Sequence, residues 1–309
     1  MVKQSTSISV IIPTLNRVDK LKVLLQSLKE SFQNLPKETE IEIIISDDST
    51  NDHTEKLIRS DFPEIKRIQG LRKGPGANRN NGARLAKGEW LIFVDDDCYV
   101  NHCYFQAYLE NIKLGEHKVL EGKIICPDKK NSIFVRQPEN AEGGVLASAN
   151  FAIRRDLFEE IEGFDEDLEI MEDMELASRL RNMNYKFLFC NSAIAYHRSQ
   201  PKPLSYYLQW IFHFKWQLLL SYKCKLKNPN LSSTHSALIT VYEHIIFLIR
   251  ISYHLFSKFD RDRWLMYTFE RFLAWVTLPI CLPYLIYWDQ LFRLKIRSDK
   301  IRVSTTYKD

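Results

Sequence analysis

Three consecutive carboxylates, Asp95, Asp96 and Asp97, directly follow a short apolar run, Trp90 to Val94. The apolar run predicts a buried strand, and ligands of open α/β sheets bind at the carboxyl ends of the strands. Three neighbouring acids repel one another unless a cation or hydrogen-bond donors neutralise them, and hard divalent cations prefer oxygen ligands. The pattern therefore predicts a metal site and an anionic substrate such as a diphosphate. A solvated acidic loop is the alternative interpretation.

A glycine-rich basic loop, residues 70–76, is a second candidate for ligand binding. It carries Arg72 and Lys73 among three glycines and leads into a segment expected to be helical. Flexible backbone and cationic side chains just before a helix suit an approaching phosphate. A surface turn has the same composition and remains the alternative.

Strand and helix patterns alternate over residues 1–200 and must position these groups. Continuous apolar runs indicate strands at 8–13 and 90–94, and further strand patterns lie at 41–45, 65–68, 119–126, 147–153, 187–189 and 193–196. Helices are expected at 21–32, 51–54, 77–86, 104–112, 156–161 and from 172 onward. Because strand, helix and strand in succession form a right-handed parallel crossover, we expect a mixed α/β domain.

The composition is that of a globular chain with an uneven charge distribution. The 309 residues are 45% hydrophobic, which suffices for one or two domains with a sizeable core. The net charge of +4 combines about −5 over residues 1–200 with about +9 over residues 201–309. The basic C-terminal part is therefore expected to meet an acidic partner such as anionic lipid.

The cysteines and the N-terminus indicate a cytoplasmic protein. The six cysteines are scattered without a C-x-x-C pair, so neither a zinc site nor a disulfide framework is expected. The first residues enter a strand pattern at once and lack the layout of a secretory signal. We expect a cytoplasmic location, with the protein peripheral on the cytoplasmic face of the membrane.

The segment 201–309 is expected to form a helical, aromatic-rich extension. An uncharged run, Leu273 to Trp288, has 16 residues and contains Pro279 and Pro283. As a helix it would be about 24 Å long, short of a bilayer core of about 30 Å, so a spanning helix is not expected. Helices lying in the membrane interface are expected instead. Helices packed on the core or on a second copy of the chain are the alternative, and no nucleic acid partner is expected.

Six motifs in one order and at characteristic spacing resemble the inverting nucleotide-sugar glycosyltransferases of family 2. They are SVIIPTLNR (9–17), DDSTND (47–52), NRNNGA (78–83), DDD (95–97), GFDE (163–166) and EDMEL (172–176). The resemblance implies a GT-A fold, a Rossmann-like mixed sheet flanked by helices, over residues 1–200. It does not extend to residues 201–309.

The resemblance also implies roles in donor binding. Pro13 and Asp48 stand where the family lines its base pocket, with the Asp48 carboxylate accepting the N3–H of uracil. Arg79 stands where the family has an arginine that faces the nucleotide or the diphosphate. Asp96 would approach the ribose. The alternative for Asp48 and its neighbour is a cap of the following helix.

The same resemblance implies a metal site and a catalytic base. Asp97, with Asp95 and His197, would hold a divalent ion, Mg²⁺ or Mn²⁺, that bridges the two phosphates. Asp173 matches the family's base and Glu172 lies beside it. A positioned carboxylate that takes the acceptor's hydroxyl proton typically contributes about 10²–10⁴-fold. A core histidine and a plain helix N-terminus are the alternatives for these positions.

Together these observations predict a metal-dependent inverting glycosyltransferase. The donor is expected to be a nucleotide sugar, uridine-linked, and the acceptor a saccharide or lipid-linked hydroxyl in the synthesis of cell-surface polysaccharide or glycolipid. A homo-oligomer is a further expected assembly. Transfer to a polyprenyl phosphate and an inactive scaffold that binds sugar nucleotides are the alternatives.

Overall fold

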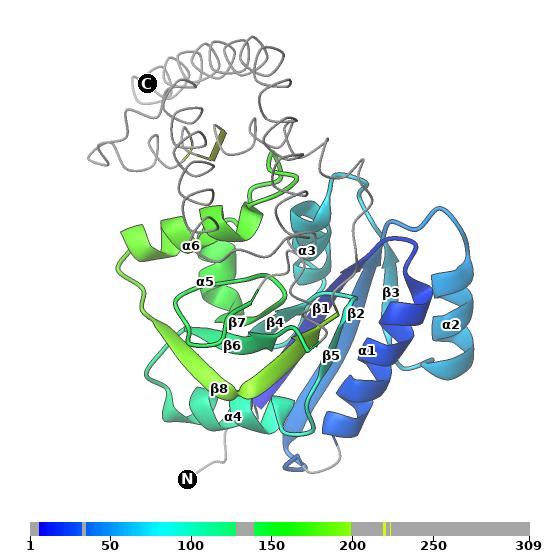
Figure 1. Ribbon diagram of the computed structural model, residues 1–309, viewed down its shortest axis with the longest axis horizontal. Coiled ribbons are helices and arrows are strands. Elements are labelled where there is room, and N and C mark those ends of the chain that lie inside the picture. Colours follow the sequence, from blue (N-terminus) through cyan, green and yellow to red (C-terminus); the bar gives the residue numbers. More distant parts are fainter. Residues whose placement is uncertain (1–5, 33–34, 128–138, 199–218, 221–222, 224–309) are drawn as a thin grey trace, which may run out of the picture. The chain divides into compact units, whose positions relative to one another are not determined.

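The computed structural model describes residues 6–32, 35–127, 139–198, 219–220 and 223 (Figure 1). The chain divides into two compact units, Met1–Lys202 and Pro203–Asp309, and the description concerns the first. The helices, aromatic residues and basic end predicted for 201–309 lie, but for three residues, outside the described part of the chain. Among the residues that are described, no helix combines the length and the apolar character needed to cross a membrane.

Eight strands of the described residues form one sheet, in the order β3-β2-β1-β4-β7-β6-β8-β5. The strands are β1 (Thr6–Thr14), β2 (Thr39–Asp47), β3 (Lys66–Gln69), β4 (Trp90–Val94), β5 (Cys98–Val100), β6 (Val119–Ile125), β7 (Asn150–Arg154) and β8 (Phe187–His197). All five residues of β4, at the centre of the sheet, are buried. The apolar runs at 8–13 and 90–94 therefore became strands covered on both faces, whereas none of the four residues of β3 is buried.

Helices cover both faces of the sheet (Figure 1). They are α1 (Val18–Ser31), α2 (His53–Asp61), α3 (Pro75–Ala83), α4 (Tyr104–Leu114), α5 (Arg155–Glu160) and α6 (Glu172–Asn182). Apolar residues of α1, α2 and α4 pack in one core cluster with Ile8, Val10 and Ile12 of β1. Those of α3, α5 and α6 pack in a second cluster with Ile11. Alternate residues of β1 thus face opposite helical layers, which fixes the register of the strand.

Strand direction brings several chain segments to one edge of the sheet. β1, β2, β3 and β4 are parallel, so their carboxyl ends lie together. β7 runs antiparallel to β4, and its first residue, Asn150, pairs with the last residue of β4, Val94. β6 is antiparallel to β7 and parallel to β8, so His197 at the end of β8 also lies at this edge. The carboxyl edge of β4 therefore meets the start of β7 and the end of β8.

The structure confirms the mixed sheet flanked by helices and differs from the prediction in two strands. The short strands expected at 187–189 and 193–196 form one strand, β8. A bulge in β8 accommodates the residues between them, and the register against β6 shifts there between Gly122 and Lys123. The extra residues of β8 include Asn191 and Ser192, which are exposed and which interrupted the apolar pattern. Three-residue β5 was not predicted.

Candidate functional site

A turn after β4 spreads the three consecutive acids over different partners. The turn is closed by a hydrogen bond of 3.1 Å from Cys98 N to Asp95 O. Asp96 is buried; its carboxylate accepts from Thr14 Oγ1 at 2.7 Å and from Arg17 Nη1 at 3.0 Å. Burial raises the pKa of Asp96 to about 6, although Arg17 and Thr14 oppose the shift. Asp96 is thus tied to the segment that follows β1.

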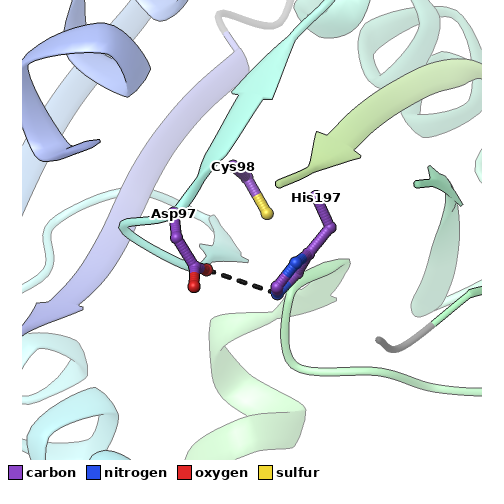
Figure 2. A group of neighbouring side chains, drawn as sticks. All are labelled: Asp97, Cys98 and His197. Atoms are coloured by element: carbon purple, nitrogen blue, oxygen red, sulfur yellow. Dashed lines mark ion pairs between the residues drawn. The ribbon is translucent and has the colours of Figure 1, made fainter. Parts of the chain in front are cut away.

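Asp97 and His197 lie next to each other, as predicted for a metal site (Figure 2). One oxygen of Asp97 is 3.3 Å from His197 Nε2, and the other is 3.3 Å from Arg17 Nη1 and 3.7 Å from Lys20 Nζ. His197 Nδ1 is buried and has no hydrogen-bond partner among the described residues. A carboxylate beside an imidazole with an unsatisfied buried nitrogen fits a divalent ion.

Cys98 joins this pair, which the sequence did not predict. Its Sγ, a carboxylate oxygen of Asp97 and a ring nitrogen of His197 all lie within 4.8 Å of one another. Burial, together with the three preceding acids, raises the pKa of the Cys98 thiol well above its ordinary value. Asp95, the third predicted metal ligand, faces elsewhere and is not one of these three clustered donors.

Arg79 joins the acidic turn after β4 to Glu172, the neighbour of the expected base Asp173. Its Nη2 donates to Asp95 Oδ1 at 2.6 Å and its Nη1 to Glu172 Oε1 at 2.7 Å. The residue is 2% exposed and its guanidinium lies 5.6 Å from the centre of the Phe164 ring. Burial opposes the charge, but Asp95 and Glu172 outweigh it and raise the pKa of Arg79 further. The structure therefore places Arg79 between two carboxylates; its predicted contact with the nucleotide stays a prediction.

Glu172 and Asp173 begin α6 after an unusual backbone turn. Met171 has φ 66°, a left-handed conformation that costs most non-glycine residues about 1–3 kcal/mol. Glu172 is buried, and this burial raises its pKa to about 7 against the opposing charge of Arg79. Asp173 is half-buried, and its carboxylate accepts from Ser148 N at 3.2 Å and from Met174 N at 2.8 Å. The two neighbours thus differ in exposure, and Asp173 is the more accessible acid.

The residues expected to line a base pocket lie at the ends of β1 and β2 and beside the glycine-rich loop. Pro13 is buried in β1, opposite Ser46 of β2. The Asp48 carboxylate accepts from Asn78 Nδ2 at 2.6 Å and from Arg72 N at 2.8 Å. A Cβ at Gly70 would lie 2.2 Å from Asp48 Oδ1, so this close approach of the loop requires glycine.

The structure brings the predicted residues to one edge and adds others that the sequence did not assign. Asp47 caps no helix. Its carboxylate accepts hydrogen bonds from Ser49 N, two residues later, and from Arg67 Nε of the adjacent strand β3. Four residues with site contacts had no predicted role: Thr14, Arg17, Asn78 and Cys98. Thr14, Arg17 and Asn78 lie inside the quoted motifs and Cys98 follows the acidic triplet, so proximity to motifs was the available signal.

Comparison with known proteins agrees with this geometry. A sequence model described as "Glycosyl transferase family 2" matches residues 9–171, which is more than half of the chain. The chain belongs to glycosyl transferase family 2. A Campylobacter jejuni relative, "GalNAc(5)-diNAcBac-PP-undecaprenol beta-1,3-glucosyltransferase", is 39% identical over 95 residues, which are 29% of each chain. The chain thus spans less than a third of this relative's length, and the likeness supports a family 2 glycosyltransferase domain.

Two solved structures share the fold. TarS of Staphylococcus aureus in complex with UDP has a TM-score of 0.57 at 21% identity, with 74% of this chain and 67% of that one covered. A mannosyltransferase of Pyrobaculum calidifontis in complex with GDP-Man and Mn²⁺ has a TM-score of 0.56 at 16% identity, with 93% and 86% covered. Together with the family match, these likenesses confirm the predicted GT-A fold.

Proposed function

We propose that the protein is a metal-dependent inverting glycosyltransferase that moves a sugar from a UDP-sugar to a hydroxyl of a surface polysaccharide or glycolipid. The observation that carries this proposal is the Arg79 bridge between Asp95 and Glu172. Through one guanidinium it joins the acidic turn after β4 to the acids that begin α6. Groups suited to a diphosphate and groups suited to an acceptor hydroxyl are thus held at one edge.

Asp97 and His197 would hold the divalent ion in this mechanism. A bound ion supplies Lewis-acid stabilisation of the negative charge that grows on the leaving diphosphate. Arg17 contacts both Asp96 and Asp97 and is 44% exposed at its side chain, so it is free to turn toward a phosphate. Lys20 adds a second positive charge near Asp97. The site residues therefore present cations as well as acids to the donor.

Asp173 is proposed to take the proton from the acceptor hydroxyl. Hydrogen bonds from the backbone N–H groups of Ser148 and Met174 hold its carboxylate in one position, and the side chain is half-buried rather than enclosed. Glu172 accepts a hydrogen bond from Arg79, which would keep the neighbouring Asp173 in place. One base is sufficient for inversion, because the acceptor oxygen attacks opposite to the leaving diphosphate.

The uridine assignment is supported by Asp48. Its two oxygens accept from Asn78 and Arg72, yet a carboxylate has about four acceptor sites, so an N3–H can still be bound. The structural neighbours hold different bases: UDP in TarS and GDP-Man in the mannosyltransferase. Isothermal titration of the protein with UDP and GDP tests the assignment, with Asp48→Asn expected to weaken UDP binding. Tighter binding of GDP would contradict it.

Two variants test the mechanism with a panel of nucleotide sugars and a cell-envelope extract as acceptor source. Asp173→Asn should bind donor as the wild type does and lose transfer by at least about 10²-fold, detected by mass spectrometry of products. Asp97→Ala should lose metal-dependent donor binding. Asp165→Asn, in the turn before α6, is the matched control. Full transfer by Asp173→Asn would refute the base, and unchanged donor binding in chelator would refute the metal site.

Transfer to a polyprenyl phosphate is the second candidate function. The name of the Campylobacter jejuni relative, a beta-1,3-glucosyltransferase of a saccharide on undecaprenol diphosphate, supports a lipid-linked hydroxyl acceptor rather than this candidate. A phosphate acceptor is already anionic and needs no strong base, so only a mild loss of transfer in Asp173→Asn would favour this candidate. Transfer to any acceptor would exclude an inactive scaffold.

A further inference from the structure

Cys98 occupies the metal-binding corner of the site although neither motif nor spacing gave it a role. It is the first residue of β5 and stands directly opposite His197 in the antiparallel pairing with β8. Directly opposed residues of an antiparallel pair point to the same face of the sheet. Figure 2 shows the Cys98 side chain directed between Asp97 and His197. The pairing of two strands almost a hundred residues apart thus sets a thiol beside an imidazole and a carboxylate.

The separations suit a shared ion. A tetrahedral ion bonded to sulfur at about 2.3 Å and to oxygen or nitrogen at about 2.0–2.2 Å holds its ligand atoms roughly 3.3–3.7 Å apart. The donor atoms of Asp97, Cys98 and His197 all lie within 4.8 Å of one another. Side-chain movements of about 1 Å therefore bring the three donor atoms to one ion.

A second observation points to a ligand at this corner. His197 is 6% exposed, and its Nδ1 has no hydrogen-bond partner among the described residues. A buried ring nitrogen without a partner is costly unless the ring is used by a ligand or an ordered water. Packing alone explains why a thiol is buried, since free cysteine behaves as a small apolar residue. Packing does not explain its alignment with this histidine and Asp97.

The chemistry of the donors decides which ions the corner prefers. Carboxylate and water ligands suit Mg²⁺ and Mn²⁺, whereas thiolate selects softer ions and imidazole suits zinc-class ions. We infer that Cys98 is a third ligand of the divalent-cation site and makes it bind thiophilic ions of the zinc and cadmium class more tightly than Mg²⁺. As the sulfur–metal bond forms, the thiol proton leaves to solvent. This inference rests on the proposed metal-dependent function and specifies its metal site.

Cadmium is the probe for this inference, because sulfur coordination gives a charge-transfer absorption that oxygen and nitrogen ligands do not give. The full-length chain is titrated with Cd²⁺ after removal of other metals, and Cd²⁺, Mn²⁺ and Mg²⁺ affinities are measured by calorimetry. Cys98→Ser and Asp97→Ala are compared with Cys190→Ser, which changes another buried cysteine of the sheet. Circular dichroism checks that each variant is folded.

The wild type and Cys190→Ser should show the absorption, saturating at one Cd²⁺ per chain, and Cys98→Ser should lose it. Loss of even an outer-shell partner costs about 10–100-fold in metal affinity, so the preference for Cd²⁺ over Mg²⁺ should fall at least about tenfold in Cys98→Ser. If Cys98→Ser does not fold, cadmium NMR of the wild type shows directly whether sulfur is bound.

The outcomes separate this inference from the proposed function. Mn²⁺ or Mg²⁺ binding that requires Asp97, without any sulfur signal from Cys98, would overturn the inference and leave the metal-dependent function standing. An unchanged ion preference in folded Cys98→Ser would do the same. A wild type that binds no divalent ion, even with UDP present, would overturn both.

Discussion

Glu172 should make the stability of the metal-free protein depend on pH, and Glu172→Gln should remove that dependence. Burial raises the pKa of Glu172 from 4.5 to about 7. Between these values the folded protein holds a proton that the unfolded chain has released. The contribution of Glu172 to the free energy of unfolding is therefore full below about pH 4.5 and is lost as the pH rises through about 7. At about 1.4 kcal/mol per pH unit, the loss is about 3 kcal/mol.

Urea unfolding at several pH values between about 5 and 8, in the presence of chelator, measures this effect. Glutamine keeps the shape and the acceptor oxygen for Arg79 but does not titrate. The stability of the wild type relative to Glu172→Gln should therefore fall by about 3 kcal/mol as the pH rises to about 8. Asp96 also has a raised pKa, but it is present in both proteins, so its contribution cancels.

Glu166→Gln is the matched control. Burial raises the pKa of Glu166, but hydrogen bonds from Arg84 and Asn80 outweigh this and leave it lowered. Its stabilisation is thus lost only as the pH falls below the ordinary glutamate range, and the variant should have the pH slope of the wild type above about pH 5. The same slope in Glu172→Gln would refute the assignment of a buried, proton-holding Glu172.

Three further predictions follow from the same geometry. Arg79→Met leaves Asp95 and Glu172 without their buried cation and should lower the free energy of unfolding by about 3–5 kcal/mol. Arg84→Met, which removes a half-exposed ion pair with Glu166, is the control and should lower it by at most about 1 kcal/mol. Equal effects of the two substitutions in urea unfolding would contradict the bridging role of Arg79. Gly122→Ala places a Cβ 2.1 Å from Asn150 Nδ2 and should cost about 1–3 kcal/mol, seen as a lower melting temperature, and an unchanged value would show that the amide can move away. The full-length chain should float with anionic but not with neutral vesicles, less so at high salt, and no flotation would favour helical packing of residues 201–309.

The local elements and the acidic cluster could be predicted because their signals are local. The strand before Asp95 is a continuous apolar run, and the helix after Met171 shows its apolar spacing within one segment. The family motifs then indicated which of these residues belong to one site. These features need no knowledge of which distant segments meet.

Apart from Asp97 and His197, which the family resemblance grouped, contacts between distant segments could not be predicted. Arg79 pairs with acids 16 and 93 positions away, and only the packing of α3 against the start of α6 selects Glu172 rather than another acid. Cys98 belongs to a three-residue strand whose partner begins almost ninety residues later, too short a pattern to be recognised. The left-handed backbone at Met171 was likewise hidden, because methionine gives no signal for positive φ.

β7 runs antiparallel to β4, so the segment that leads into β7 could be exchanged with that of a relative without changing the parallel strands. The residues that hold Asp48, Asp96 and Asp97 belong to consecutive parallel crossovers, whereas Ser148, which contacts Asp173, lies in the segment that enters β7 from the other direction. A chimaera that exchanges residues 126–149 with a relative would alter the surroundings of Asp173 and leave β1, β2 and β4 untouched. Under the proposed function, exchange of this segment would therefore change the surroundings of the base and leave Asp48, Asp96 and Asp97 in place.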